Sequence, residues 1–432
     1  MNALQVAQHC FDNWNGRDAD AIVATFADGG TYGDPAWGRG LRGEALANYA
    51  EEWDPNTNRA PNLKARRKYL AVAALVFAVV QGWTDLAAHA QSLSMGNGDL
   101  RVMTYNVDEG TDFIEISQAT NATQFLIAVG QTITQVRATN PPERMQAVAK
   151  QIIAAAPALV SLQEVDQWSS GPFNPLTRTF GPGAVEFDML QELLDALVAQ
   201  GGHYEVAARV KQYNFPKTPG LIPPSAFLWV QVIDENVILA RTDLDLSKFQ
   251  WSNAQSGQFI NILSLTTPSG PVPLPRVWCS VDVTFNGRTF RFINTHLESS
   301  DPTVRELQGA ELRDPQSQPA KTSQPLVVAM DSNAQAFPFP QDPTYVDFIN
   351  AGYNDAWSEI FPFAPGFTAS QAQFVNNPVS QLYQRIDLIL TLGSVQAQNI
   401  ALFGADPSTR TPGGLWPSDH AGVAAQLVVE SQ

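Results

Sequence analysis

Cysteine is nearly absent from this sequence, which has only Cys10 and Cys279 among 432 residues. If the chain is cleaved near Ala90, as argued below, Cys279 is alone and no intramolecular disulfide can form. Cys279 lies in the apolar pattern RVWCSVDVTF, which is typical of a strand, so we expect it to be a small core residue. Stability must then come from packing, for which 44% hydrophobic residues are ample.

Positive charge is also scarce. The chain has 26 Lys and Arg against 42 Asp and Glu, a formal net charge of −16. This balance gives no basic surface of the kind that binds nucleic acid tightly. It argues only weakly against a nuclease, because a bound divalent cation can supply positive charge locally.

Long apolar runs are missing as well. The run over residues 69–80 is too short for a comfortable membrane span. Basic residues precede it from Lys64, and the small-x-small sequence AHA ends at Ala90. Residues 64–90 therefore have the parts of a secretory signal peptide, and we expect a secreted or periplasmic protein after cleavage near Ala90. An uncleaved anchor over residues 69–83 and a buried helix are the alternatives.

The segment that precedes this signal has a different character. Residues 5–55 include FADGGTYGDPAWGRG and resemble the opening of the SnoaL-like/NTF2-like α+β family, but they cover less than half of such a domain. We interpret residues 1–60 as a truncated fragment that has lost its own function, or as the result of a start site placed too far upstream. A cytosolic small-molecule-binding protein of the SnoaL type is the alternative, which the intervening signal disfavours.

Residues 98–431 alternate short β-rich runs with turns and two segments of helical spacing, residues 141–156 and 186–200. Many strands with helices between them predict two sheets packed face to face and flanked by helices. The polar or Pro/Gly-rich stretches 109–140 and 253–275 are expected to be surface loops that shape a substrate cleft.

Polar side chains recur where the predicted strands end. Taken singly, each is most simply a turn residue or a structural residue. Their repetition in one order predicts a site at the rim of the sandwich. The residues concerned are Asn106, Glu164, His296, Asp331, Asn333, Asp387, Asp419 and His420.

These endings lie in motifs that resemble the endonuclease/exonuclease/phosphatase superfamily, which includes DNase I-like nucleases. The motifs are TYNV, SLQEV, INTHLE, MDSN, RIDLIL and SDHAGV, spread over residues 100–429. The departures are Met330 for the usual Gly, Ser332 for a commoner Phe, and a long insert after Val107. The resemblance implies an α/β fold, specifically a four-layer sandwich of two mixed sheets, and hydrolysis of phosphodiester bonds.

The resemblance also implies roles for the site residues. Asn106, Glu164 and Asp419 are expected to serve the metal site, with Mg²⁺ as the ion and Mn²⁺ or Ca²⁺ as alternatives. Asp331 would orient or deprotonate the attacking water, and Asn333 would donate a hydrogen bond to a phosphate oxygen. His420 would pair with Asp387, and His296 would act as hydrogen-bond donor or general acid.

The substrate is less defined than the reaction. His296 is typical of DNase I-like enzymes and sphingomyelinases, so a secreted nuclease is favoured and DNA repair disfavoured. A sphingomyelinase or phospholipase, a small-molecule phosphodiesterase, a phosphomonoesterase and an inactive binding module are the alternatives. Tyr213 and Asn214, in VKQYNFPKTPG, are candidates for contact with a substrate phosphate. No stable protein partner is implied, and we expect a monomer.

Overall fold

The computed structural model describes residues 100–267 and 270–430 of the chain. The expected signal segment (residues 64–90) and the SnoaL-like fragment (residues 1–60) lie outside the described residues, so those expectations stay predictions. Among the described residues, no helix combines the length and the apolar character needed to cross a bilayer.

The larger sheet contains the first strand of the described chain at its centre. Its strand order is β17-β18-β1-β2-β8-β3-β4, with β5 paired to β3 and with β6 and β7 paired to β8. Strands β1 and β2 are parallel, and the other pairs are antiparallel. The strands are β1 (Leu100–Asn106), β2 (Leu159–Gln163), β3 (Gln167–Asn174), β4 (Thr179–Phe180), β5 (Ala184–Asp188), β6 (Tyr204–Asn214), β7 (Thr218–Ile222), β8 (Ala226–Arg241), β17 (Val395–Phe403) and β18 (Gly422–Val429).

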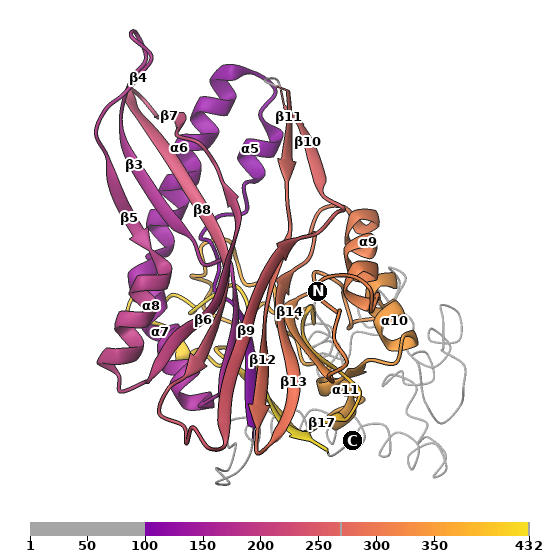
Figure 1. Ribbon diagram of the computed structural model, residues 1–432. Helices are drawn as coiled ribbons and strands as arrows, with labels where there is room; N and C mark the ends of the chain where they lie inside the picture. Colours follow the sequence, from indigo (N-terminus) through magenta and orange to yellow (C-terminus); the bar gives the residue numbers. More distant parts are fainter. Residues whose placement is uncertain (1–99, 268–269, 431–432) are drawn as a thin grey trace, which may run out of the picture. The chain divides into compact units, whose positions relative to one another are not determined.

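The second sheet has the order β15-β16-β14-β13-β12-β9. Here β13 and β14 are parallel, while β14 and β16 are antiparallel. A separate hairpin, β10 (Leu263–Thr267) with β11 (Gly270–Leu274), stands beside this sheet (Figure 1). The strands are β9 (Phe249–Gln258), β12 (Val277–Phe285), β13 (Arg288–His296), β14 (Leu326–Asp331), β15 (Asn354–Asp355) and β16 (Asp387–Leu392).

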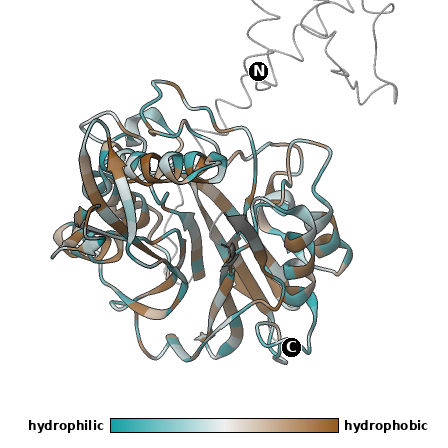
Figure 2. Ribbon diagram, turned by 90° about the horizontal axis from the view of Figure 1, so that it is seen from above, coloured by the Kyte–Doolittle hydropathy of each residue, from teal (hydrophilic) through white to brown (hydrophobic). Residues whose placement is uncertain are grey.

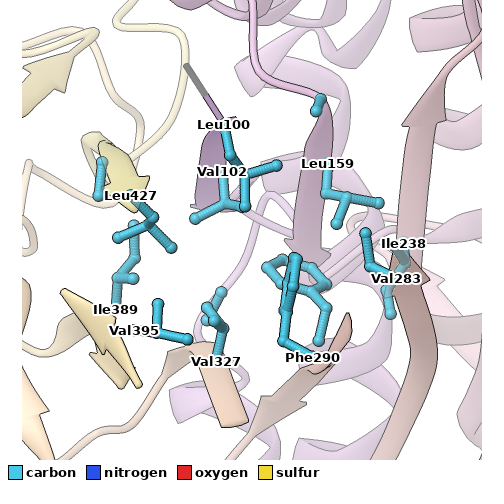
Figure 3. Packing of buried hydrophobic residues seen from close by; sticks show 14 of the residues in the cluster. Leu100, Val102, Leu159, Ile238, Val283, Phe290, Val327, Ile389, Val395 and Leu427 are labelled. Atoms are coloured by element: carbon cyan, nitrogen blue, oxygen red, sulfur yellow. The ribbon is translucent and has the colours of Figure 1, made fainter. Parts of the chain in front are cut away.

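The inner faces of the two sheets meet in one hydrophobic core (Figure 3). Alternate residues of each strand point inward, so Leu100 and Val102 of β1 face the second sheet, whereas Met103 and Tyr105 face the helices. Phe290 of β13 belongs to the same inner cluster. Cys279 of β12 is fully buried in it, as expected for a small core residue. Seen from above, hydrophobic strand segments lie in the middle of the described part (Figure 2).

Helices cover the outer face of each sheet, which completes four layers (Figure 1). Helices α7 and α8 share a buried cluster with the outer face of β1 and β2, and α9 and α10 share one with β14 and β16. The predicted four-layer α/β sandwich is therefore confirmed. The helices are α5 (Ile114–Gln118), α6 (Ala122–Thr139), α7 (Pro141–Ala155), α8 (Met189–Ala199), α9 (Pro302–Arg313), α10 (Pro343–Asn350), α11 (Ala356–Ile360) and the 3-10 helix η2 (Pro407–Thr409).

Both helices expected from the sequence form close to their predicted bounds. Helix α7 begins at a proline, whose missing N–H costs nothing in the first turn, and ends before Ala156 in the left-handed region at φ 49°. Helix α8 is capped by Asp188, whose side chain accepts a hydrogen bond from the Gln191 N–H.

The expectation that residues 109–140 form a surface loop is wrong. Most of this insert is helix α6, whose cap is Asn121 and whose buried face includes Val129, Ile133 and Val136. That face packs with Trp168, with β7 and with the first half of β8. The polar, Thr- and Gln-rich composition of α6 hides its apolar stripe. The second expected loop, residues 253–275, is also structured, since it contains the end of β9 and both strands of the β10–β11 hairpin.

Candidate active site

The site lies where strands of both sheets end at the same edge. In the larger sheet Asn106 ends β1, and Glu164 follows β2, which runs parallel to it. In the second sheet one row of the register carries His296, Asp331 and Asp387 on β13, β14 and β16. Parallel strands bring their carboxyl ends together, and the row then places three of the candidate side chains on neighbouring strands.

Asp331 lies at the centre of this arrangement and is buried. One carboxylate oxygen, Oδ2, accepts a hydrogen bond from Asn106 Nδ2 at 3.0 Å, and the other accepts one from the Asn333 backbone N–H at 2.9 Å. His296 Nε2 and His420 Nε2 lie 3.5 and 3.9 Å from Oδ2. Burial alone would raise the pKa of Asp331, but the two histidines and its hydrogen bonds hold the pKa below its ordinary value.

The Asn106 amide joins the two sheets at the site. The same Nδ2 that reaches Asp331 also donates to Glu164 Oε1 at 2.9 Å. The other oxygen of Glu164 accepts from the Glu109 backbone N–H at 2.9 Å. Glu164 has φ 57°, in the left-handed region that non-glycine residues rarely adopt, and this backbone conformation is part of how its carboxylate is aimed at the site.

His420 and Asp387 are brought together despite their separation in sequence. His420 Nδ1 donates to Asp387 Oδ2 at 2.8 Å, which leaves Nε2 facing Asp331 and Asp419. Burial raises the pKa of Asp387 to about 6. Burial would lower the pKa of His420, but Asp387 and Asp419 together raise it well above its ordinary value. The pair is therefore an imidazolium and a carboxylate at neutral pH.

The neighbouring residues of the SDH sequence have separate tasks. Ser418 Oγ donates to the Asn106 carbonyl at 2.8 Å and accepts from the His420 N–H at 3.0 Å. Ser418 thus fastens the last loop to the end of β1 and is no nucleophile of a triad. Thr368, which the sequence interpretation did not consider, accepts at Oγ1 from the backbone N–H of Asp387 at 3.1 Å.

His296 has the opposite electrostatic character to His420. Burial and then the charge of Arg276 lower the pKa of His296 to about 3, so the ring is neutral. Asn333 Nδ2 lies 2.9 Å from His296 Nε2 and donates to it, which puts the ring proton on Nδ1. In this state His296 accepts a hydrogen bond on Nε2. The resemblance implies that His296 is a hydrogen-bond donor or a general acid. A neutral ring with its proton on Nδ1 fits the donor role better than the general-acid role.

Asn333 is held in position by several contacts. Its backbone has φ 48°, and Nδ2 donates to the Leu297 carbonyl at 3.0 Å as well as to His296. A hydrogen bond from Asn333 to a phosphate oxygen therefore requires one of these bonds to be exchanged. The unusual Ser332 fits this loop, because its Oγ donates to the Ile386 carbonyl at 2.6 Å, and Met330 packs outward toward the helices.

Acidic groups outnumber cations at the site. Burial and the neighbouring Asp419 raise the pKa of Glu164 to about 8, and burial raises the pKa of Asp419 to about 7. Two sets of potential ligand atoms lie within 4.8 Å of one another, Glu164 with His296 and Asp331, and Asp331 with Asp387 and His420. Oxygen donors with raised pKa values fit a hard divalent cation, whose charge would relieve their repulsion.

Arg276 is a cation near the site that the sequence interpretation missed. Its Nη2 donates to Ser299 Oγ at 3.2 Å, and its Nε lies 3.5 Å from Glu298 Oε2. Its charge acts on His296 and on Glu109. It follows β11 and precedes β12, a position without a sequence signal for function.

The two substrate candidates of the VKQYN segment have different surroundings. Tyr213 on β6 donates from its hydroxyl to Glu109 Oε2 at 2.9 Å, and Glu109 in turn contacts Glu164 through its backbone. Asn214 is exposed, and its Oδ1 accepts from Gln231 Nε2 at 3.1 Å. The structure thus brings Tyr213 to the margin of the site and directs Asn214 to a neighbouring strand.

A polar bridge between the sheets supports the site and was also missed. Gln163 Nε2 donates to Asn294 Oδ1 at 2.9 Å across the core. Asn294 Nδ2 donates to the carbonyls of Leu162 and Val237 at 2.9 and 2.8 Å. Gln163 and Asn294 lie in the motifs SLQEV and INTHLE. A polar residue at an inward position of a predicted strand is the sequence feature that could have indicated this bridge.

A buried arginine supports the loop that follows β1. Arg144 of α7 donates to the carbonyls of Val107 and Asp108 at 2.7 and 2.9 Å and to that of Thr139 at 2.9 Å. These contacts hold the chain that carries Glu109 against the start of α7.

Comparison with known proteins gave structural likeness only. No protein-family model matches the chain, and no curated protein matches it. An endonuclease/exonuclease/phosphatase family protein from Bacteroides thetaiotaomicron is similar over 78% of this chain and 97% of that chain, with 18% identity and a TM-score of 0.47. A mannosyl-6-phosphatase from the same organism covers 76% and 99%, with 16% identity and a TM-score of 0.44.

A third similar structure is TDP2 from D. rerio in complex with a single-strand DNA product, which covers 77% of this chain and 100% of that chain at 16% identity and a TM-score of 0.43. At such identities the likeness concerns the fold alone. The sheet order and the flanking helices define the described part as a four-layer α/β sandwich, the fold that the sequence resemblance implies.

Proposed function

We propose that this protein is a divalent-metal-dependent hydrolase of phosphodiester bonds. The observation that carries the proposal is the convergence on Asp331 of Asn106, both histidines and the Asp387–His420 ion pair, from strand ends of both sheets. Closely packed acidic, amide and imidazole groups of this kind suit the binding of a phosphoryl group and the activation of water.

Asn106, Glu164 and Asp419 would hold the metal, with Mg²⁺ first and Mn²⁺ or Ca²⁺ as alternatives. A bound cation would act there as a Lewis acid toward a phosphoryl oxygen and offset the charge that develops in the transition state.

The protein groups divide the remaining work. Asp331, ionised at neutral pH, orients the attacking water and takes up its proton as the new O–P bond forms and the bond to the leaving oxygen breaks. The His420 imidazolium, oriented by Asp387 through Nδ1, donates from Nε2 to a phosphoryl oxygen. Neutral His296 and Asn333 form a hydrogen-bonded pair at the other side of Asp331 and position the same phosphoryl group.

Nucleic acid is the first substrate to test, because the sequence resemblance favours a nuclease. A phospholipid head group or another small phosphodiester is the second candidate, and the polar cavity described below favours a small, hydrogen-bonding group. Secretion after cleavage near Ala90, with a membrane anchor over residues 69–83 as the alternative, and a monomeric state without a stable protein partner complete the proposal.

The test uses purified protein that starts at Gln91, supercoiled plasmid as one substrate and bis(4-nitrophenyl) phosphate as another. We expect hydrolysis of the chromogenic diester to require Mg²⁺, to stop in EDTA, and to fall by about 10²–10⁴-fold in His420→Ala. Nicking of the plasmid with the same dependence identifies a nuclease.

His203→Ala is the matched control, because His203 is an exposed histidine beside a glycine turn and should leave the rate unchanged. A folded protein that hydrolyses neither substrate with Mg²⁺, Mn²⁺ or Ca²⁺ contradicts the proposed hydrolase. Equal rates for His420→Ala and His203→Ala contradict the placement of His420 in the active site.

A further inference from the structure

An open polar cavity of about 360 Å³ adjoins the candidate active site. Asn333, whose amide contacts His296, forms part of its wall. The wall also contains Ser299, Arg305, Gln335, Asp342 and Gln384. Its volume lies in the range of about 300–1,000 Å³ that is usual for small-molecule sites. A group attached to a phosphoryl unit at Asp331 would thus have a cavity of suitable size beside it.

The charges of this cavity are paired within its own wall. Arg305 Nη2 donates to Asp342 Oδ2 at 2.8 Å. Arg305 Nη1 donates to the backbone carbonyls of Glu298 and Ser299 at 2.9 and 3.2 Å. Because the guanidinium is matched by a carboxylate, the wall offers no spare positive charge to a second phosphate and no spare negative charge to a cationic group.

The remaining wall groups are oriented amides. Gln384 Nε2 donates to Gln335 Oε1 at 3.1 Å, and Gln384 Oε1 accepts from Ser370 Oγ at 3.2 Å. Gln335 Nε2 donates to the Pro338 carbonyl at 2.7 Å. These bonds fix both amide planes, and each amide oxygen has a second lone pair that can accept another hydrogen bond. Arg305 Nε is buried and has no hydrogen-bond partner among the described residues.

Among the described residues, no aromatic or long apolar side chain lines this cavity. Its apolar wall residues are Pro340 and Ile386. A flipped or single-stranded base is normally stacked on an aromatic ring, and an acyl chain needs an extended apolar wall. Neither ligand matches this wall, whereas the hydroxyls of a neutral polyol can donate to the free lone pairs of both amide oxygens and accept from the second N–H of Gln384.

We propose that this cavity is a subsite for an uncharged polyhydroxyl group, such as a sugar ring, that is esterified to the phosphoryl group. The substrate class is then a sugar or polyol phosphodiester. This inference rests on the proposed function, because it assigns the cavity to a substituent of the phosphoryl group that the site hydrolyses. Gln335 and Gln384 would favour a hydroxylated group over a hydrocarbon group of the same size, because their amides form hydrogen bonds with hydroxyls.

The test compares two 4-nitrophenyl phosphodiesters that share a leaving group. One carries glucose through O6, and the other carries cyclohexylmethanol, a ring of similar size without hydroxyls. We expect the wild-type kcat/KM to be at least about tenfold higher for the glucose ester, since each hydrogen bond contributes about 0.5–1.5 kcal/mol and about 1.4 kcal/mol corresponds to tenfold.

Gln335→Leu and Gln384→Leu keep the size of the side chain and remove its hydrogen bonds. Each should remove most of the preference by raising KM for the glucose ester, with kcat and the cyclohexylmethyl ester little changed. Gln318→Leu is the matched control, because Gln318 is exposed and lies outside the cavity wall. Thermal unfolding of each variant verifies folding.

Saturation-transfer NMR with methyl glucoside separates the two proposals, because it reads binding without turnover. Binding that is lost in Gln335→Leu but kept in Gln318→Leu supports the subsite even if no ester is hydrolysed, in which case the proposed function fails alone. Hydrolysis of both esters at equal rates, with no glucoside binding, overturns the subsite and leaves the hydrolase standing.

Discussion

Groups of the same chemical type at the site have different pKa values, because each has different neighbours. His296 and His420 lie on either side of Asp331, yet one is neutral and the other charged. The cause is the surroundings of each ring: burial and then the charge of Arg276 lower the pKa of His296, whereas Asp387 and Asp419 raise the pKa of His420. Two histidines with different protonation states can do different work at one pH.

The raised pKa of Glu164 predicts how pH acts on the metal-free protein. Its folded-state pKa of about 8 exceeds its ordinary value of 4.5, so its contribution to stability is fully present below about pH 4.5 and is lost as pH rises through about 8. Thermal unfolding in EDTA should therefore show wild type losing stability relative to Glu164→Gln between about pH 5 and about pH 8.5. Mg²⁺ should raise the wild-type Tm more at the upper end of this range.

The Glu164→Gln variant is also the control for the metal, because an amide lacks the charge that binds the cation. If wild type and Glu164→Gln show parallel pH profiles and the same response to Mg²⁺, Glu164 is neither strongly buried as an acid nor part of a cation site.

At the scale of elements, the distance between the two sheets is set by packing and by the Gln163–Asn294 bridge. The bridge is fully buried together with the hydroxyls of Ser161 and Thr104, so its polar groups have no water to replace a lost partner. The bridge lies directly behind the strand ends that carry Glu164 and His296, so it fixes one sheet relative to the other at the site.

Replacement of Asn294 by Leu should therefore destabilise the protein strongly. The change removes the Nδ2 donor from the carbonyls of Leu162 and Val237, at about 1–3 kcal/mol for each unsatisfied buried group. It also removes one acceptor of Gln163 Nε2, which keeps Ser161 Oγ at 2.9 Å and Thr104 Oγ1 at 3.2 Å. We expect a loss of about 3 kcal/mol or more in the free energy of unfolding measured with urea. Gln396→Leu, at an exposed position on β17, should change it by less than about 0.5 kcal/mol, and equal losses in both variants would contradict the bridge.

At the scale of the whole molecule, the sandwich of residues 100–430 has its own core and its own site. We predict that protein starting at Gln91 unfolds in one cooperative transition and hydrolyses the chromogenic diester as fast as the full-length chain. Full-length protein expressed in a bacterium with a secretory pathway should yield a secreted form whose N-terminal sequence begins at Gln91. Recovery of residues 1–60 in the exported protein would contradict the signal-peptide interpretation.

Much of the fold could be read from the sequence, because buried strands and amphipathic helices leave regular patterns. The β runs around SLQEV and INTHLE, and the helices at residues 141–156 and 186–200, follow periodicity that local packing imposes. The sequence pattern does not reveal helix α6, because its apolar stripe is narrow and embedded in Thr, Gln and Ala. Its partner Trp168 is distant in sequence, so only tertiary packing makes that stripe recognisable.

Residue order is enough to predict which chemical groups end the strands, because a strand stops at polar or turn residues and these groups are amides, acids and histidines in one order. The distances between these groups, and their charges, depend on the tertiary structure. Nothing local predicts that Asn106 reaches both Glu164 and Asp331, that His296 is neutral, or that Arg305 and two glutamines enclose a neutral cavity. The physical reason is that hydrogen bonding and burial depend on which strands become neighbours, and that choice is made by the whole core.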